Sequence, residues 1–121
     1  MANPNIVNVV RILANTVSGT FTTSNTVFHT NPASSGSVHK INSIVIANID
    51  GAANADFDLI LNNAGSNTFI IRTVVVPGDA TLVAVDKNSG FYLLENSTIG
   101  GAASANNDLS FVISLEQIYA S

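Results

Sequence analysis

The 121-residue sequence contains no cysteine and no tryptophan, and it has few charges of either sign. The absence of cysteine excludes disulfides, thiolate metal sites and cysteine nucleophiles. Charged residues make up 10% of the chain, against about 25% in an ordinary globular domain. The four Lys and Arg residues and the net charge of −4 cannot provide a phosphate-neutralising surface. We therefore expect no nucleic-acid partner.

Long hydrophobic runs are also missing. No apolar run approaches the roughly 18 residues of a transmembrane helix, so we expect no membrane partner. The first residues, Met1 to Asn5, contain neither a basic stretch nor a long apolar one. We therefore expect no secretory signal peptide, and synthesis in the cytoplasm. Disorder is disfavoured, because disordered chains combine low hydrophobicity with high net charge, whereas 46% of this chain is hydrophobic.

Neutral polar residues are abundant instead: the chain has 16 Asn, 13 Ser and 10 Thr. Apolar positions recur with period two, β-branched residues dominate, and turn residues interrupt the apolar segments about every 8–12 positions, which is typical of an all-β protein. We predict a single domain over residues 1–121. Its expected architecture is an antiparallel β-sandwich of jelly-roll type with about eight strands.

The strands are expected at intervals along the whole chain. They are Ile6–Leu13, one or two strands within Gly19–His29, His39–Ile49, Ala55–Leu61, Thr68–Val76, Thr81–Val85, Phe91–Leu94 and Leu109–Ile118. Small and polar residues predict loops at 31–37, 50–54, 63–66, 86–90 and 100–107. Pro77-Gly78 fits a type II turn, and Gly65 is available for a positive φ.

The alternating segments also predict which side chains form the core. In residues 55–61 and 109–115, every second residue is apolar, so these side chains should point between the two sheets. The predicted core comprises Phe57, Leu59, Leu61, Phe69, Phe111, Ile113 and Leu115.

The expected outer faces differ from those of a typical monomeric sandwich. Such proteins usually carry Lys and Glu on their edges and faces to block association between strands. Here the faces carry Ser, Thr, Asn and additional aliphatic residues, as in Ile44–Ile46 and Val74–Val76. These surfaces favour burial against another subunit, so we expect a homo-oligomer, with a trimer favoured. Coverage of the same strands by loops within the domain is the alternative.

Few residues are suited to catalysis. His29 and His39 are the two histidines, and serines and aspartates are numerous, but no Gly-x-Ser-x-Gly motif is present. A histidine near the end of a strand is most often a hydrogen-bonded structural residue. We therefore expect no catalytic residue, and a protein that is not an enzyme.

Metal and ligand sites are weakly indicated. Asp56 and Asp58 share one face of a strand, and Asp50 and Asn54 in the preceding turn could add oxygen ligands suited to Ca²⁺. Alternate aspartates also mark the solvent face of an amphipathic strand, and the spacing matches no EF-hand loop. We expect no metal and no cofactor. Stacking on a sugar or base would depend on the tyrosines, Tyr92 or Tyr119.

Four segments resemble a known group of proteins. These are Ile44-Val45-Ile46-Ala47-Asn48 with the alternating strand after it, Val76-Pro77-Gly78-Asp79-Ala80-Thr81-Leu82-Val83, Asp86-Lys87 with Phe91-Tyr92-Leu93-Leu94-Glu95, and Ala103–Asn107 leading into Leu109–Glu116. In these segments the chain resembles small virion structural proteins of tailed bacteriophages, especially marine and cyanobacterial ones. It departs from them at Glu95-Asn96-Ser97, where they have Gly-Asp after the Glu, and residues 14–40 carry no resemblance.

The resemblance implies a β-sandwich without an active site that assembles with copies of itself and with other virion proteins, such as the major capsid protein. The expected function is that of a capsid decoration or cement protein that stabilises the head. A tail, neck or baseplate/fibre component is the alternative within the virion. A carbohydrate-binding module is the alternative from another class. The expected location is the virion, after synthesis in the host cytoplasm.

Overall fold

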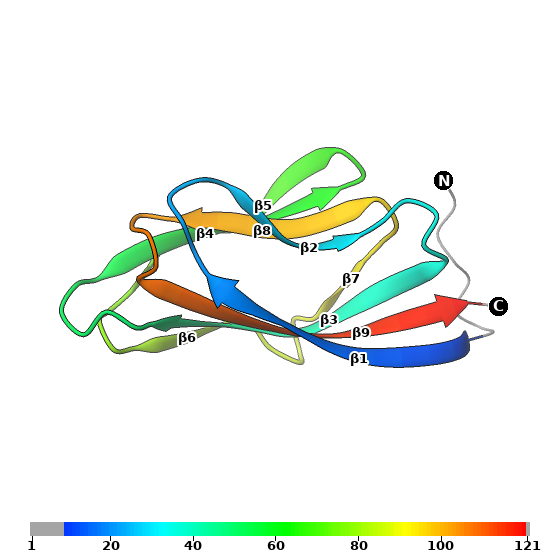
Figure 1. Ribbon diagram of the computed structural model, residues 1–121, viewed down its shortest axis with the longest axis horizontal. Coiled ribbons are helices and arrows are strands. Elements are labelled where there is room, and N and C mark those ends of the chain that lie inside the picture. The colour runs from blue at the N-terminus through cyan, green and yellow to red at the C-terminus, as the bar shows by residue number, and fades with distance from the viewer. Residues whose placement is uncertain (1–8, 121) are drawn as a thin grey trace.

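The computed structural model describes residues 9–120, and all of its regular structure is β-strand (Figure 1). The strands are β1 (Val9–Thr20), β2 (Thr26–Asn31), β3 (Ser37–Asn48), β4 (Ala55–Asn63), β5 (Ser66–Val76), β6 (Thr81–Val85), β7 (Phe91–Leu93), β8 (Ser97–Ala103) and β9 (Leu109–Ala120). The prediction of an all-β fold is confirmed, with nine strands rather than eight. Within the described residues there is no helix long and apolar enough to cross a membrane.

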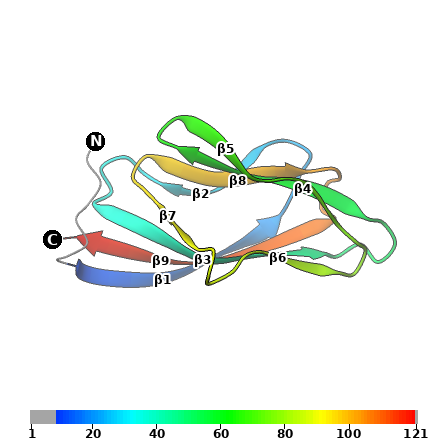
Figure 2. The ribbon, with the colours of Figure 1, turned by 180° about the vertical axis from the view of Figure 1, so that it is seen from behind.

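Two antiparallel sheets pack face to face (Figures 1 and 2). The first has the order β1-β9-β3-β6, with β7 also paired to β3, and the second has the order β2-β8-β4-β5. The chain forms a long two-stranded ribbon: β4 pairs with β5 at its tip, β3 with β6 and β7, β2 with β8, and β1 with β9. Wrapping this ribbon pairs β9 with β3 and β8 with β4, which gives the predicted jelly-roll sandwich.

The core lies between the sheets and follows the period-two pattern. Every second residue of β9 from Leu109 to Leu115 is buried, and β4 shows the same alternation from Ala55 to Leu59. Leu61 is partly buried and packs against this core. Phe21 contacts three other rings edge-on, with centroid distances of 5.0, 5.5 and 5.7 Å. Its partners are Phe28, Phe57 and Phe111.

The prediction that Phe69 belongs to the core is wrong, since 46% of its surface is exposed. Phe69 lies opposite Ile60 in the β4–β5 pairing. Because Leu59 and Leu61 point towards the core, Ile60 and the residue opposite it point outwards. The pairing contains two register shifts, between Phe57 and Leu59 and between Leu59 and Ile60. An alternation counted along β5 alone cannot reveal these shifts.

The prediction of a loop over residues 100–107 is also wrong at its start, because Ser97–Ala103 forms β8, an inner strand of the second sheet. Its small residues are required by close packing of neighbouring backbones. A Cβ atom on Gly100 would collide with the carbonyl oxygen of Thr26, and one on Gly101 would collide with that of Asp58. Small residues here mark a crowded strand rather than an exposed loop.

The boundaries of the first strand differ from the prediction. Residues 6–8 of the expected Ile6–Leu13 lie outside the described residues, and β1 continues to Thr20.

The expected turn after β5 is present but lies one residue later. Ala80 N donates to Pro77 O over 3.0 Å, and the positive φ of 60° falls on Asp79 rather than Gly78. Gly65 has the expected positive φ of 95°.

Candidate functional site

The two histidines meet between the sheets. His29 on β2 and His39 on β3 belong to different sheets, and Nε2 of His29 lies 2.7 Å from Nδ1 of His39. Nε2 of His39 lies 3.1 Å from the hydroxyl of Ser37, which lies 3.0 Å from the hydroxyl of Ser35. This contact could not be predicted from the sequence, because His29 and His39 are ten residues apart and nothing in the pattern shows that the sandwich brings them together.

Burial lowers the pKa of both histidines. For His39, burial and then the nearby His29 lower the pKa to about 4, so the pair is neutral at pH 7, with one ring donating a hydrogen bond to the other. Ser37 is fully buried, so no substrate reaches its hydroxyl in this structure. The arrangement acts as a hydrogen-bonded link between the two sheets.

The acidic and amide residues around β4 bind separate backbone groups. An Asp58 carboxylate oxygen accepts a hydrogen bond from Thr73 N over 2.7 Å, and an Asp50 oxygen accepts one from Ala52 N over 3.0 Å. The side-chain oxygen of Asn54 accepts from Gly78 N over 3.2 Å. In the described part of the chain, no three His, Asp or Glu residues gather where they could hold a metal ion. These side chains hold turns and a β-bulge in place.

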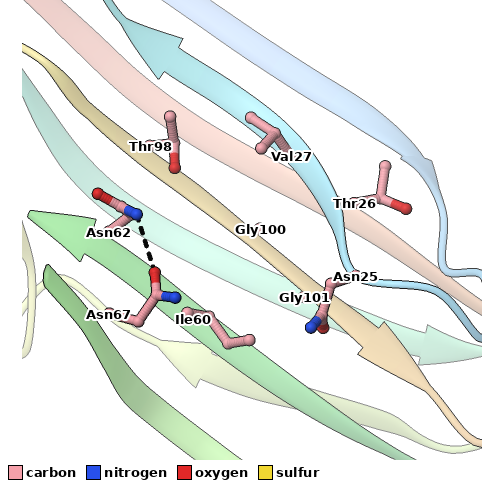
Figure 3. Close-up of a pocket in the computed structure, with 9 residues that line it drawn as sticks. All are labelled: Asn25, Thr26, Val27, Ile60, Asn62, Asn67, Thr98, Gly100 and Gly101. Atoms are coloured by element: carbon pink, nitrogen blue, oxygen red, sulfur yellow. Dashed lines mark hydrogen bonds between the residues drawn. The ribbon is translucent and has the colours of Figure 1, made fainter. Parts of the chain in front are cut away.

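A shallow depression of about 150 Å³ lies on the outer surface of the second sheet (Figure 3). Gly100 lies between Val27 on β2 and Ile60 on β4, and at one end the amide of Asn62 donates to Asn67 over 2.9 Å. The lining is neutral and comprises Asn25, Thr26, Val27, Ile60, Asn62, Asn67, Thr98, Gly100 and Gly101. Such groups can hydrogen-bond an uncharged ligand. The depression is not predicted by any motif in the sequence, although its two glycines, Gly100-Gly101, are adjacent there.

The tyrosines do not form one stacking surface. Tyr92 on β7 is exposed, whereas the guanidinium of Arg11 lies 4.1 Å from the centre of the Tyr119 ring on β9. The exposed Phe69 is covered in the same manner by Arg72, at 4.7 Å. Two of the three rings therefore already have a cation on one face.

The outer face of the first sheet carries an apolar, uncharged region around Val112. Val112, Val45 and Val83 lie side by side on β9, β3 and β6, and we call them the valine row. Val83 is 56% exposed, and Val112 is also exposed. Small residues occupy the adjacent outward positions, which are Ser18, Ser43, Ala47, Ser110 and Ser114.

A second apolar region lies at the edge of the same sheet. The first half of β1 exposes Val9, Val10, Ile12 and Leu13. Within residues 9–120, β1 pairs only with β9, so its other edge is open. On the outer face, Glu116 on β9 and Lys40 on β3 lie opposite each other between the valine row and the outward-pointing Ile12, so the two apolar regions are separate.

No protein-family model and no curated protein sequence match this chain. Among solved structures, the fold is similar to that of a chain from the Bacillus endospore appendages, described as "a novel family of disulfide-linked pili". The TM-score is 0.56 at 12% sequence identity, and the match covers 94% of this chain and 90% of that chain. This likeness concerns the fold. Because the present chain has no cysteine, it cannot form the disulfides for which those pili are described.

Proposed function

We propose that this protein is a structural subunit of a bacteriophage virion that assembles with copies of itself and decorates the head as a cement protein. The observation that carries the proposal is the presence of two exposed apolar regions on the first sheet, the valine row and the first half of β1, in which Arg11 is the single charged residue. Contiguous exposed apolar side chains mark surfaces that contact other molecules, whereas single exposed apolar residues are ordinary. The resemblance of four sequence segments to small virion proteins of tailed bacteriophages supports the placement in a particle.

The chemistry of the surface suits repeated contacts between subunits. Burial of Val, Ser and Ala residues brings little desolvation cost, whereas burial of a Lys or Glu must be offset by a well-placed partner. The similar fold in a pilus chain supports the same reading, because a jelly-roll sandwich there belongs to an assembled appendage. We propose no reaction for this protein, and no bound cofactor.

The placement is tested by the copy number in purified particles. Quantitative mass spectrometry should give a ratio to the major capsid protein that corresponds to hundreds of copies per head. A few copies per particle would instead indicate a tail, neck or baseplate/fibre component. Absence from purified particles would contradict both placements. The sequence favours a trimer, and the number of subunits in the oligomer is measured separately from the mass of the purified protein in solution.

Carbohydrate binding is a second candidate, favoured by the neutral depression around Gly100 (Figure 3). Its amides and hydroxyls could hydrogen-bond a sugar, although none of the residues that line it is aromatic. A glycan array tests this function. Binding that is lost in Asn67→Ala and kept in Asn88→Ala, an exposed amide in the loop after β6, would support it. An array without signal would contradict it.

A further inference from the structure

The strands at the edges of the two sheets are not equally suited to pair with another chain. On β5, a bulge places Thr73 at a φ of 54°, and Asp58 binds the backbone N–H of that residue. The other edge of the second sheet, β2, has six residues and a register shift between Val27 and His29. Short strands and bulges are the features that prevent edge-to-edge association.

The two edges of the first sheet differ in the same respect. One consists of β6 and β7, with five and three residues, separated by the loop at 86–90. The other is β1, with 12 residues and no register shift from Arg11 to Thr20. Its only charged residue is Arg11, and it contains no proline. Among the described strands, β1 is therefore the one edge that is long, regular and unprotected.

The side chains of this strand also lack cover on both faces of the sheet. Ile12 points outwards and is 55% exposed, while its neighbour Leu13 points to the other face and is 43% exposed. A strand that exposes aliphatic residues on both faces gains from a neighbouring strand, whose side chains cover both faces at once.

We propose that β1 pairs antiparallel with β1 of a second copy of this chain, across a two-fold axis normal to the sheet. This inference rests on the self-association in the proposed function and defines its contact. Between two copies of this chain, β1 pairs with β1 rather than with another edge, because the bulged or short edges at β2, β5 and β6–β7 cannot match a regular strand of this length. The contact joins two first sheets into one continuous sheet, with both valine rows on the same face.

The alternation of side chains between the two faces of β1 restricts the register of a symmetric pair. In an antiparallel pair, opposite residues share a face, so a symmetric pair must be centred on one residue. A centre at Ala14 uses nearly the whole strand and places Arg11 opposite Val17, away from the Arg11 of the other copy. It also makes the two Leu13 side chains diagonal neighbours, so that each covers apolar surface of the other.

Engineered cysteines test the register, because the natural chain has none. Ala14→Cys should form a disulfide-linked dimer on mild oxidation, since opposite Cβ atoms approach to about 4.5 Å and a small strand movement brings them within the reach of a disulfide. Ser18→Cys is the control: position 18 is also exposed and lies on the same strand and face, but the two substituted side chains of a dimer would lie about 27 Å apart. Equal cross-linking of both variants, or none of Ala14→Cys, would overturn the proposed register.

Light scattering over a range of concentrations tests the contact itself. The wild-type protein should approach a mass of 25 kDa, twice the 12.5 kDa of one chain. Leu13→Lys should weaken the dimer at least tenfold, because the two ammonium groups would meet near the axis. Ile49→Lys, at an exposed aliphatic residue just after the end of β3 and outside both apolar regions, should change the affinity less than twofold. Circular dichroism verifies that both variants are folded.

The other outcomes separate this contact from the proposed function. A wild-type mass of three chains would overturn the two-fold contact but leave self-association standing. A monomer at every concentration would overturn the contact, while the place of the protein in the virion would still be decided by its copy number in particles. Equal effects of the two lysine substitutions would show that β1 is not the contact.

Discussion

Nε2 of His29 on β2 lies 2.7 Å from Nδ1 of His39 on β3, so this hydrogen bond joins the two sheets of the sandwich. At least one of the two imidazole rings must be neutral for this hydrogen bond to form, because two imidazolium rings would both be donors. His39 is 3% exposed and has a serine hydroxyl on its other nitrogen. The stability of the sandwich should therefore depend on the protonation of this pair.

We expect the protein to lose stability as the pH falls from about 6.5 towards 4. Burial holds the pKa of His39 at about 4 in the folded state, and that of His29 below its ordinary value. Below pH 6.5 the unfolded chain therefore binds more protons than the folded chain, which favours unfolding. Urea denaturation at several pH values measures this effect.

The variant His39→Gln is the control for the pH dependence, because an amide can hydrogen-bond to its neighbours and does not titrate. Its stability should be lower than that of the wild type at pH 7 but should change less between pH 6.5 and 5. Above pH 7 the histidines of both folded and unfolded wild-type chains are neutral, so their contribution should be constant. A wild-type stability that is flat from pH 7 to 5 would contradict the expectation.

The two phenylalanines of β4 and β5 should respond very differently to truncation. Phe57 is buried and contacts the ring of Phe21, so Phe57→Ala should cost about 3–5 kcal/mol of unfolding free energy. Phe69 points to solvent, so Phe69→Ala should cost less than about 1 kcal/mol. Denaturant titrations of both variants test the assignment of faces, and similar losses would show that it is wrong.

These two residues also show what the sequence could predict. Period-two alternation is a local property of one strand, and it identified the buried faces of β4 and β9 correctly. The direction of Phe69 depends on shifts in the pairing between two strands, which no single-strand pattern contains. The approach of His29 to His39 likewise depends on how the ribbon wraps. The residue types were visible in the sequence, whereas their juxtaposition was a property of the fold.

Gly100 should be much less tolerant of substitution than Gly19. A Cβ on Gly100 would collide with the backbone of β2, which cannot move without breaking the β2–β8 pairing. A Cβ on Gly19 would approach ring atoms of Phe111 at 3.2–3.3 Å, and a side chain can adjust by that amount. We expect Gly100→Ala to cost about 2–3 kcal/mol or more and Gly19→Ala about 1 kcal/mol or less. Thermal melts of both variants provide the comparison.

The carboxylate of Asp58 should stabilise the bulge on β5 without binding a metal. Asp58→Ala removes the acceptor for the Thr73 N–H and should cost about 1–2 kcal/mol, whereas Asp58→Asn keeps an acceptor oxygen and should cost less. Thr73→Gly should offset part of the loss, because glycine adopts a φ of 54° without strain. Melting in excess CaCl₂ and in EDTA should give the same midpoint for the wild type, and a large calcium-dependent increase would indicate a metal site.

The last prediction concerns the particle. If the protein cements the head, each bound copy stabilises the lattice by an amount set by its affinity and concentration. Particles without it should have heads of normal size but release DNA at a lower temperature, and added wild-type protein should restore the release temperature. Val83→Lys should restore it less well, because it places a charge in the valine row. If the protein belongs to the tail, its removal should leave the heads thermally unchanged and abolish adsorption or tail completion. Particles that remain equally stable and fully infectious without it would contradict both roles.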